Sequence, residues 1–284
     1  MLEIFQYDFM QKAFITGLLI AIITPCIGVV VVLKRLSMIG DSLSHNSLAG
    51  VAAGLAFGIN PILGAVMFSV VAAFGIERIR KSFPNYSEIS IAVIMSTGIG
   101  LAGILSGFVK NSANFNSFLF GSIVAISDFE LYMVVGLSAI VILAVIFLYK
   151  ELFYITFDEE SARLAGIPVR SINFVFTLLT AVTISISART VGTLVISSLM
   201  VLPVASAMQI AKSYRQTVVY AVIFAIFFTL LGLYISYYAN FKPGGTIVIV
   251  GVTTLVCVLI YKNVLGQVIF KRAIKAALQN NLHK

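Results

Sequence analysis

The chain has 284 residues, of which 60% are hydrophobic and 11% are charged, and its mean hydropathy is +1.06. Soluble domains are about 45–50% apolar and about 25% charged, so this composition excludes a soluble globular protein and indicates an integral membrane protein. The net charge of +8 does not indicate nucleic-acid binding, because Lys and Arg in a membrane protein hold its loops on the cytoplasmic side.

Nine apolar segments follow one another along the chain, and most have about the 20 residues that a helix needs to cross a bilayer. Segments of this kind predict α-helices rather than a β-barrel. We therefore predict an all-α, polytopic bundle of eight or nine transmembrane helices that forms a single domain over residues 1–284. The predicted segments are 13–33, 37–59, 61–77, 89–108, 131–149, 171–188, 190–210, 217–239 and 246–262.

The basic residues predict the orientation of these segments in the membrane. If the N-terminus lies outside, alternation of the loops places 15 of the 19 Lys and Arg residues on one side. The positive-inside rule makes that side cytoplasmic. The basic tail, at about 263–284, and the C-terminus are then cytoplasmic as well.

The stretch GDSLSHNSLAGVAAG, residues 40–54, places an aspartate and a histidine in an apolar segment. In a helix that starts near Ser37, Asp41 lies about 6 Å and His45 about 12 Å from the start. The two share one face of the helix, and Ser37 and Ser44 flank it. Ionisable groups inside a membrane are costly, so they indicate a functional site. The competing interpretation is a polar pair that only hydrogen-bonds to a neighbouring helix.

A carboxylate and an imidazole are two metal ligands. Imidazole suits zinc and other transition metals, and carboxylate also suits manganese. One chain supplies only Asp41 and His45, whereas two copies related by a dyad would supply four ligands. Because histidine must be neutral to bind a metal, acid should weaken such a site. The opposite face of the helix carries Gly50, Gly54 and Gly58, whose four-residue spacing predicts close packing against another helix.

The outside loop 109–130 is long and partly apolar, so it could dip back into the protein. Arg189 is expected at a later outside turn, where its side chain would reach toward water along the apolar surface.

The long cytoplasmic loop contains FDEESARLAGIPV, which predicts a short surface helix at about 157–167. Asp158 can cap this helix, and Glu159 and Glu160 suit its positive end. Gly166 ends it. The competing interpretations are an ordinary surface helix and a docking helix for a cytoplasmic partner.

Motifs of catalytic and nucleotide-binding sites are absent from the sequence. There is no GxxxxGK[ST] loop, so the chain does not bind ATP in the P-loop manner, and there is no HExxH or GxSxG. We therefore predict that the chain is not an enzyme.

The chain resembles the membrane permease subunit of bacterial ABC importers for zinc, manganese or iron, over nearly its whole length. The resemblance rests on five stretches in the same order: MIGDSLSHNSLAGVAAG at 38–54, FLFGSIVAIS at 118–127, FDEESARLAGIPV at 157–169, VGTLVISSLMVLPVASA at 191–207 and SYYANFKPGGTIV at 236–248.

This resemblance implies a homodimer in the bacterial cytoplasmic membrane. It also implies two cytoplasmic ATP-binding subunits, which hydrolyse ATP, and an extracytoplasmic protein that delivers the metal ion. No cofactor is permanently bound, because the zinc, manganese or iron ion is the cargo. In the family the DSLSH motif lines the path, which assigns metal contacts to Asp41 and His45. Asn46 stands where the family often has a small alanine.

The resemblance also implies that residues 158–166 form a coupling helix, which fits a groove of the ATPase. Asp158, Glu159 and Gly166 shape this helix, and the expected contacts are made by Glu160, Arg163 and Leu164.

Three other interpretations remain open from the sequence. A proton-coupled secondary transporter would use Asp41 and His45 as a proton relay. An ABC permease for an iron chelate or cobalamin would need a wide cavity without metal ligands of its own, which the Asp41–His45 pair disfavours. A purely structural membrane protein would leave both residues dispensable.

Overall fold

The computed structural model describes residues 6–80, 82–83, 86–109, 115, 117–119, 121 and 126–282, with only the backbone for 194 and 265–282. Its long elements are all α-helices: α1 (Asp8–Leu33), α2 (Ile39–Phe57), α3 (Pro61–Arg80), α4 (Ser87–Ser106), α6 (Asp128–Phe147), α7 (Tyr149–Phe157), α8 (Glu159–Leu164), α9 (Val169–Val191), α10 (Thr193–Met208), α11 (Tyr214–Ala239) and α12 (Pro243–Leu282).

The prediction of an all-α polytopic membrane protein is confirmed. Within the described residues, seven helices are long and apolar enough to cross a membrane: α1, α3, α4, α6, α9, α11 and α12. The other two predicted segments are α2, which carries several polar residues in its first half, and α10, which has 16 residues. Each of the nine predicted segments therefore corresponds to a helix.

Two boundaries differ from the prediction. The predicted segments 171–188 and 190–210 meet at Gly192, where α9 ends and α10 begins after a single residue. Gly192 has φ of +102°, a backbone conformation that side-chain-bearing residues rarely adopt. At the other boundary, α6 ends at Phe147 and α7 follows almost at once, so the short surface helix α8 is preceded by a second helix that the sequence did not predict.

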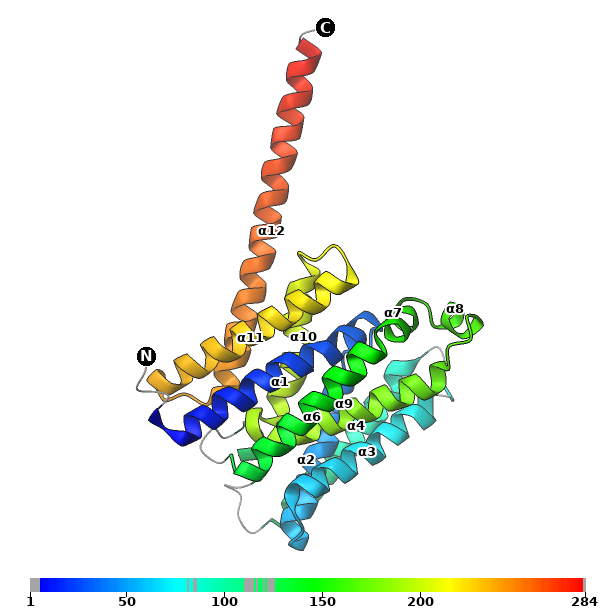
Figure 1. Cartoon of the computed structure of the whole chain (residues 1–284), viewed down its shortest axis with the longest axis vertical. Helices are drawn as coiled ribbons and strands as arrows, with labels where there is room; N and C mark the ends of the chain where they lie inside the picture. The colour runs from blue at the N-terminus through cyan, green and yellow to red at the C-terminus, as the bar shows by residue number, and fades with distance from the viewer. Residues whose placement is uncertain are drawn as a thin grey trace.

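The helices run back and forth between two ends of the bundle (Figure 1). The N-terminus lies at one end, and α7 and α8 lie at the opposite end, which we call the α8 end. Helix α10 lies in the centre, where it packs against α1, α2, α9, α11 and α12. The largest cluster of buried side chains joins these helices, with Ile23, Leu43, Ile184 and Met200 among its members.

Candidate functional site

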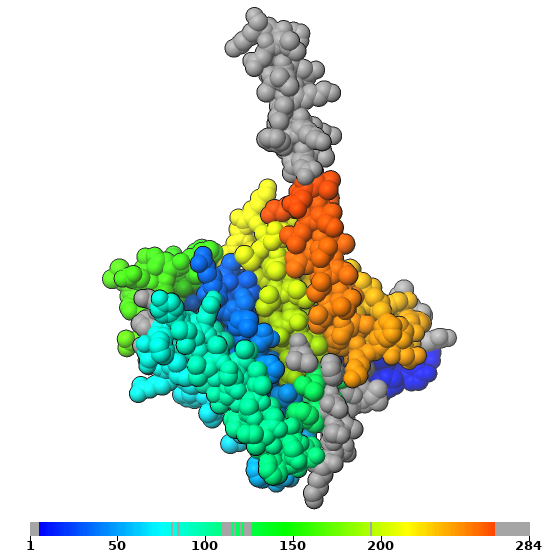
Figure 2. Space-filling view, turned by 180° about the vertical axis from the view of Figure 1, so that it is seen from behind, coloured from blue at the N-terminus to red at the C-terminus, as the bar shows by residue number. Residues whose placement is uncertain are grey.

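Helix α2 is buried except where it carries its two ionisable residues. From Ile39 to Gly54 every residue is buried apart from Asp41 and His45, which are half-buried. The side of the molecule seen in Figure 2 shows why, because α2 reaches the surface as a blue strip between α4 and α10. Among the described residues, neither side chain has a hydrogen-bond or ion-pair partner. The pair therefore lies on one open face and is not used to hold the helix in place.

The buried face of α2 is fixed by two glycines. A Cβ atom on Gly50 would come within 2.1 Å of the carbonyl oxygen of Gly64 in α3, and one on Gly54 would lie 2.7 Å from the Cα atom of Pro61. Backbone thus lies directly against backbone, as small residues at this spacing allow. Gly58 differs from the prediction: it has no atom within 4 Å of a Cβ position, and it ends α2 with a φ of +71°.

The predicted flanking serines lie in different surroundings. Helix α2 begins at Ile39, two residues later than predicted, so Ser37 is half-buried in the turn before it. Asp41 and His45 are then about 3 Å nearer to the helix start. Ser44 is only 3% exposed and its hydroxyl has no hydrogen-bond partner, so it faces the bundle rather than the open face of α2.

Asn46, next to His45, fastens α2 to α4. Its side-chain amide donates to the carbonyl oxygen of Ser42 at 2.8 Å and to that of Ile94 in α4 at 2.9 Å. A Cβ atom on Gly98 of α4 would lie 2.7 Å from the Asn46 amide nitrogen. The polar residue at this position thus fills the space that a glycine leaves open, and it orients the helix that carries His45.

Within the part of the chain that the structure describes, Asp41 and His45 are the two ionisable side chains on the open face of α2. Within the described residues, no three His, Cys, Asp or Glu side chains lie close enough together to hold a metal ion. A tetrahedral zinc site has four ligands. Among the residues that the structure describes, the open face of α2 therefore offers a metal ion one carboxylate and one imidazole.

The surface helix α8 forms at the α8 end as the sequence predicts. The carboxylate of Asp158 accepts hydrogen bonds from the amide groups of Glu160 and Ser161, at 3.1 and 3.0 Å. The hydroxyl of Ser161 also donates to it. These hydrogen bonds, above all that from the Ser161 hydroxyl, lower the pKa of the Asp158 carboxyl. The helix ends at Leu164, and Gly166 follows with a φ of +82°.

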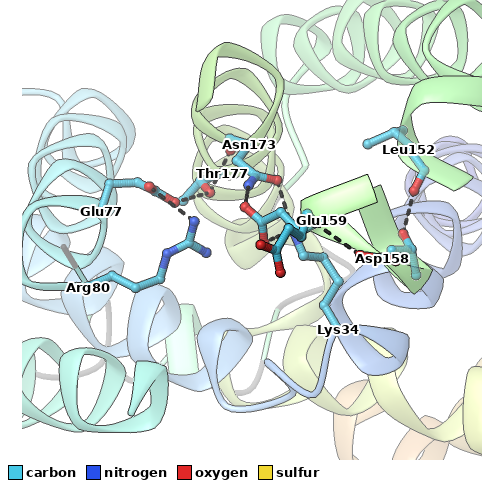
Figure 3. Close-up of polar contacts among 10 residues, drawn as sticks. Lys34, Glu77, Arg80, Leu152, Asp158, Glu159, Asn173 and Thr177 are labelled. Atoms are coloured by element: carbon cyan, nitrogen blue, oxygen red, sulfur yellow. Dashed lines mark hydrogen bonds and ion pairs between the residues drawn. The ribbon is translucent and has the colours of Figure 1, made fainter. Parts of the chain in front are cut away.

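The side chains of α8 point in two directions. Glu160, Arg163 and Leu164 are exposed, and Leu164 is 86% exposed. Ala162 is buried against Leu152 and Val169. Glu159 turns toward the protein, where it contacts α9 and the turn after α1 (Figure 3). Helix α8 is thus attached to the bundle on one side and open to a partner on the other.

At the N-terminal end of the bundle, Arg189 does not reach freely toward water as predicted. Its Nε atom lies 3.1 Å from a carboxylate oxygen of Glu130 in α6, and its guanidinium lies 4.7 Å from the ring centre of Phe118. Phe118 is 3% exposed and packs with Leu48 and Ala102. The described part of the loop 109–130 therefore packs into the protein at this point. The rest of the loop lies outside the described residues.

The fold brings together several polar residues that the sequence did not single out, namely Lys34, Glu77 and Asn173. The signal available was a single asparagine in the apolar segment that follows Pro168. One of its partners, Lys34, lies 139 positions away, and the other, Glu159, lies on a separate helix, so no local pattern predicts the cluster.

The chain is similar to known proteins over nearly its whole length. The model of the ABC 3 transport family matches residues 6–262. A "probable metal transport system membrane protein" of Treponema pallidum is 38% identical over 256 residues, which cover 89% of this chain and 96% of that protein. The manganese transport system membrane protein MntC of Listeria monocytogenes is 32% identical over 246 residues, or 86% of this chain and 88% of that protein.

Two further comparisons extend this similarity. The high-affinity zinc uptake system membrane protein ZnuB of Haemophilus influenzae is 28% identical over 246 residues, covering 86% of this chain and 94% of that protein. Among solved structures, PsaBC from Streptococcus pneumoniae in complex with Fab is 28% identical and superposes with a TM-score of 0.79. That match covers 89% of this chain and 91% of the other.

Proposed function

The chain belongs to the ABC 3 transport family and is the membrane permease of an ABC transport system, and from this premise we propose that it passes a divalent metal ion, zinc or manganese, across the membrane at Asp41 and His45. One observation carries the proposal: these two are the residues of α2 between Ile39 and Gly54 that are not buried. Family relatives are named for manganese transport and for zinc uptake.

The chemistry of the pair suits a transported ion rather than a resident one. Two copies of the chain, with the open faces of α2 turned toward a common dyad, bring two carboxylates and two imidazoles together. These ligands can replace water molecules that the ion sheds, and both zinc and manganese accept them. Among the described residues neither side chain of the pair has a hydrogen-bond or ion-pair partner, so both are free to bind and to release an ion. Histidine ligates only when neutral, so uptake should weaken in acid.

The orientation follows from charge. With 15 of the 19 basic residues on the α8 side by the loop alternation, this end faces the cytoplasm, and the other end faces outward in a bacterial cytoplasmic membrane. The C-terminus is then cytoplasmic. An extracytoplasmic binding protein delivers the ion to the outer end of the homodimer.

The energy for transport comes from a separate partner subunit. The chain has no P-loop, so a separate cytoplasmic ATPase subunit binds and hydrolyses ATP. It docks on the exposed side of α8, where Glu160, Arg163 and Leu164 offer an acid, a base and an apolar anchor. ATP binding then moves α8 and switches access to the metal pair. The protein itself holds no permanent cofactor.

The test is uptake of radioactive Zn²⁺ or Mn²⁺ into proteoliposomes that contain the chain, its ATPase subunits and the loaded binding protein. We expect Asp41→Ala and His45→Ala each to abolish ATP-dependent uptake, because each removes half of the ligands that a chain supplies. Both variants should still assemble, as judged by size-exclusion chromatography. His283→Ala, which removes the other histidine of the chain, is the matched control and should transport normally.

Two results would contradict the proposal in different ways. Normal uptake by both Asp41→Ala and His45→Ala would show that the ion takes another route. Uptake by the chain alone, driven by a proton gradient without ATP, would indicate a secondary transporter in place of an ABC permease.

A further inference from the structure

Helix α8 is attached to the transmembrane helices by a cluster of three polar side chains, Lys34, Glu159 and Asn173 (Figure 3). The side-chain amide of Asn173 donates to a carboxylate oxygen of Glu159 at 2.8 Å. Its carbonyl oxygen accepts a hydrogen bond from the Nζ atom of Lys34, also at 2.8 Å. Lys34 and Glu159 themselves lie 3.8 Å apart. Each of the three side chains therefore contacts the other two.

The chemistry of this cluster fits asparagine better than other residues. Asn173 uses its donor and its acceptor at once, with the donor facing the anion and the acceptor facing the cation. It is 6% exposed, and the side chain of Lys34 is 11% exposed. Burial lowers the pKa of Lys34, and the carboxylate of Glu159 opposes this effect. Loss of the central amide would leave partly buried charges without their hydrogen bonds, which is costly.

The position of the cluster joins the surface helix to the metal helix. Glu159 is the first residue of α8, Asn173 lies in the first turns of α9, and Lys34 lies in the turn after α1. That turn leads directly into α2 at Ile39, two residues before Asp41. Two hydrogen bonds and a turn thus connect α8 to the start of α2.

A second branch runs from α9 to α3. The hydroxyl of Thr177, one turn after Asn173, lies 3.4 Å from a carboxylate oxygen of Glu77, which in turn lies 3.5 Å from Arg80. Helix α3 packs backbone to backbone against α2 at Gly64. The contacts of this second branch, at 3.4 and 3.5 Å, are longer than the two hydrogen bonds of the first, at 2.8 Å. We therefore treat it as a supporting connection between α9 and α2, and the Lys34–Asn173–Glu159 cluster as the main one.

We propose that Asn173 is a positioning residue that transmits the movement of α8 to the helix carrying Asp41 and His45. This inference rests on the proposed function, in which an ATPase subunit moves α8. In its simplest form, the Lys34–Asn173–Glu159 cluster makes α8, the start of α9 and the turn before α2 move as one unit. When the cluster is broken, the ATPase still docks on the exposed side of α8, but the movement of α8 no longer displaces the helix that carries Asp41 and His45.

The test measures ATP hydrolysis and metal uptake side by side in the complete transporter in proteoliposomes. We expect Asn173→Ala, which removes both hydrogen bonds of the cluster, and Glu159→Gln, which removes the negative charge that faces Asn173 and Lys34, each to lower the number of Zn²⁺ or Mn²⁺ ions taken up per ATP hydrolysed by at least about tenfold, the factor that corresponds to one contact with a charged group. ATP hydrolysis itself should stay near the wild-type rate. Glu88→Gln, which removes an exposed carboxylate in the first turn of α4, is the control and should leave the ratio unchanged.

Exchanging the donor and the acceptor between positions 159 and 173 should restore the coupling that the single variants lose. In the double variant Glu159→Gln with Asn173→Asp, the new amide at position 159 can donate to the new carboxylate at position 173. That carboxylate can also accept from Lys34. The donor and acceptor are exchanged while the geometry is kept, so the ratio of ions to ATP should return toward that of the wild type.

Three results would overturn the proposal. An unchanged ratio in both single variants would show that the cluster does not transmit the movement. A parallel loss of hydrolysis and uptake that the double variant does not restore would assign Asn173 to folding alone. If the wild-type transporter itself took up no metal with ATP, the proposed function would fail first, and the coupling role with it.

Discussion

The close approach of α2 and α3 predicts that adding a side chain at Gly50 destabilises the protein strongly. In the variant Gly50→Ala the added methyl group would lie 2.1 Å from the carbonyl oxygen of Gly64 and 2.5 Å from its carbonyl carbon. Ordinary contacts begin at 3.4 Å, so the two helices must separate by about 1.3 Å (3.4 − 2.1) at this crossing. All of the opposing atoms are backbone atoms, so no side-chain rotation can relieve the clash.

The change in the free energy of unfolding caused by Gly50→Ala follows from two opposing effects. Forcing an extra methyl group into a packed interior costs about 3 kcal/mol at the upper end of the usual range. Replacing glycine by alanine within a helix returns about 1 kcal/mol. The free energy of unfolding should therefore fall by about 2 kcal/mol, which corresponds to a decrease in Tm of about 4–8 °C. The separation would also displace the face of α2 that carries Asp41 and His45.

The assay is heating in detergent followed by size-exclusion chromatography of the protein that remains monodisperse. The control is Gly136→Ala in α6, where a Cβ atom would have nothing within 4 Å, so its Tm should stay at or slightly above the wild-type value. If Gly50→Ala unfolds at the same temperature as the wild type or above it, the helices are not in backbone contact at this crossing and the reasoning fails.

Two other predictions concern the ends of the bundle. Arg189→Ala leaves the carboxylate of Glu130, whose side chain is 11% exposed, without its cation and should lower the free energy of unfolding by about 2 kcal/mol. Adding Glu130→Gln should recover part of this loss in thermal unfolding, and strictly additive effects would contradict the pairing. Because hydrogen bonds from Ser161 lower the pKa of Asp158, its cap should persist as the pH falls and disappear only when the pH passes through the lowered pKa. The protection factor of the Ser161 amide, which is its hydrogen-exchange rate corrected for the pH dependence of an unstructured amide, should thus be the same at neutral pH and at about pH 4, where an unperturbed aspartate is half protonated, and early loss of protection would refute the cap.

Much of the architecture could be predicted from the sequence because apolar length and charge decide it locally. Each of the nine apolar segments became a helix, and the Asp158 cap and Gly166 stop placed α8 within a few residues. The Asp41–His45 pair could be singled out because ionisable groups in an apolar segment are conspicuous. The single-residue link between α9 and α10 was expected at residue 189 and lies three residues later at Gly192, because the serines and threonines around it are compatible with helix and do not mark where one helix ends.

The polar contacts between helices could not be predicted from the sequence. Lys34 and Asn173 are separated by 139 positions, and no local pattern indicates that they meet. Arg189 was expected to reach water, since a lone arginine near a helix end usually does so, but Glu130 lies beside it in the folded chain. Burial of these groups depends on how the helices pack, and the pattern of one helix does not contain that information.

The position of α10 has a consequence for how the protein responds to lipid. At 1.5 Å per residue its 16 residues span about 24 Å, less than the hydrocarbon thickness of about 30 Å. A helix of that length in contact with lipid would tilt or thin the bilayer around it. Among the described side chains of α10, however, only Met208 at its end is exposed. Hydrophobic mismatch therefore acts on the outer helices, such as α4 and α11, while α10, in the centre of the bundle, is insulated from changes in membrane thickness.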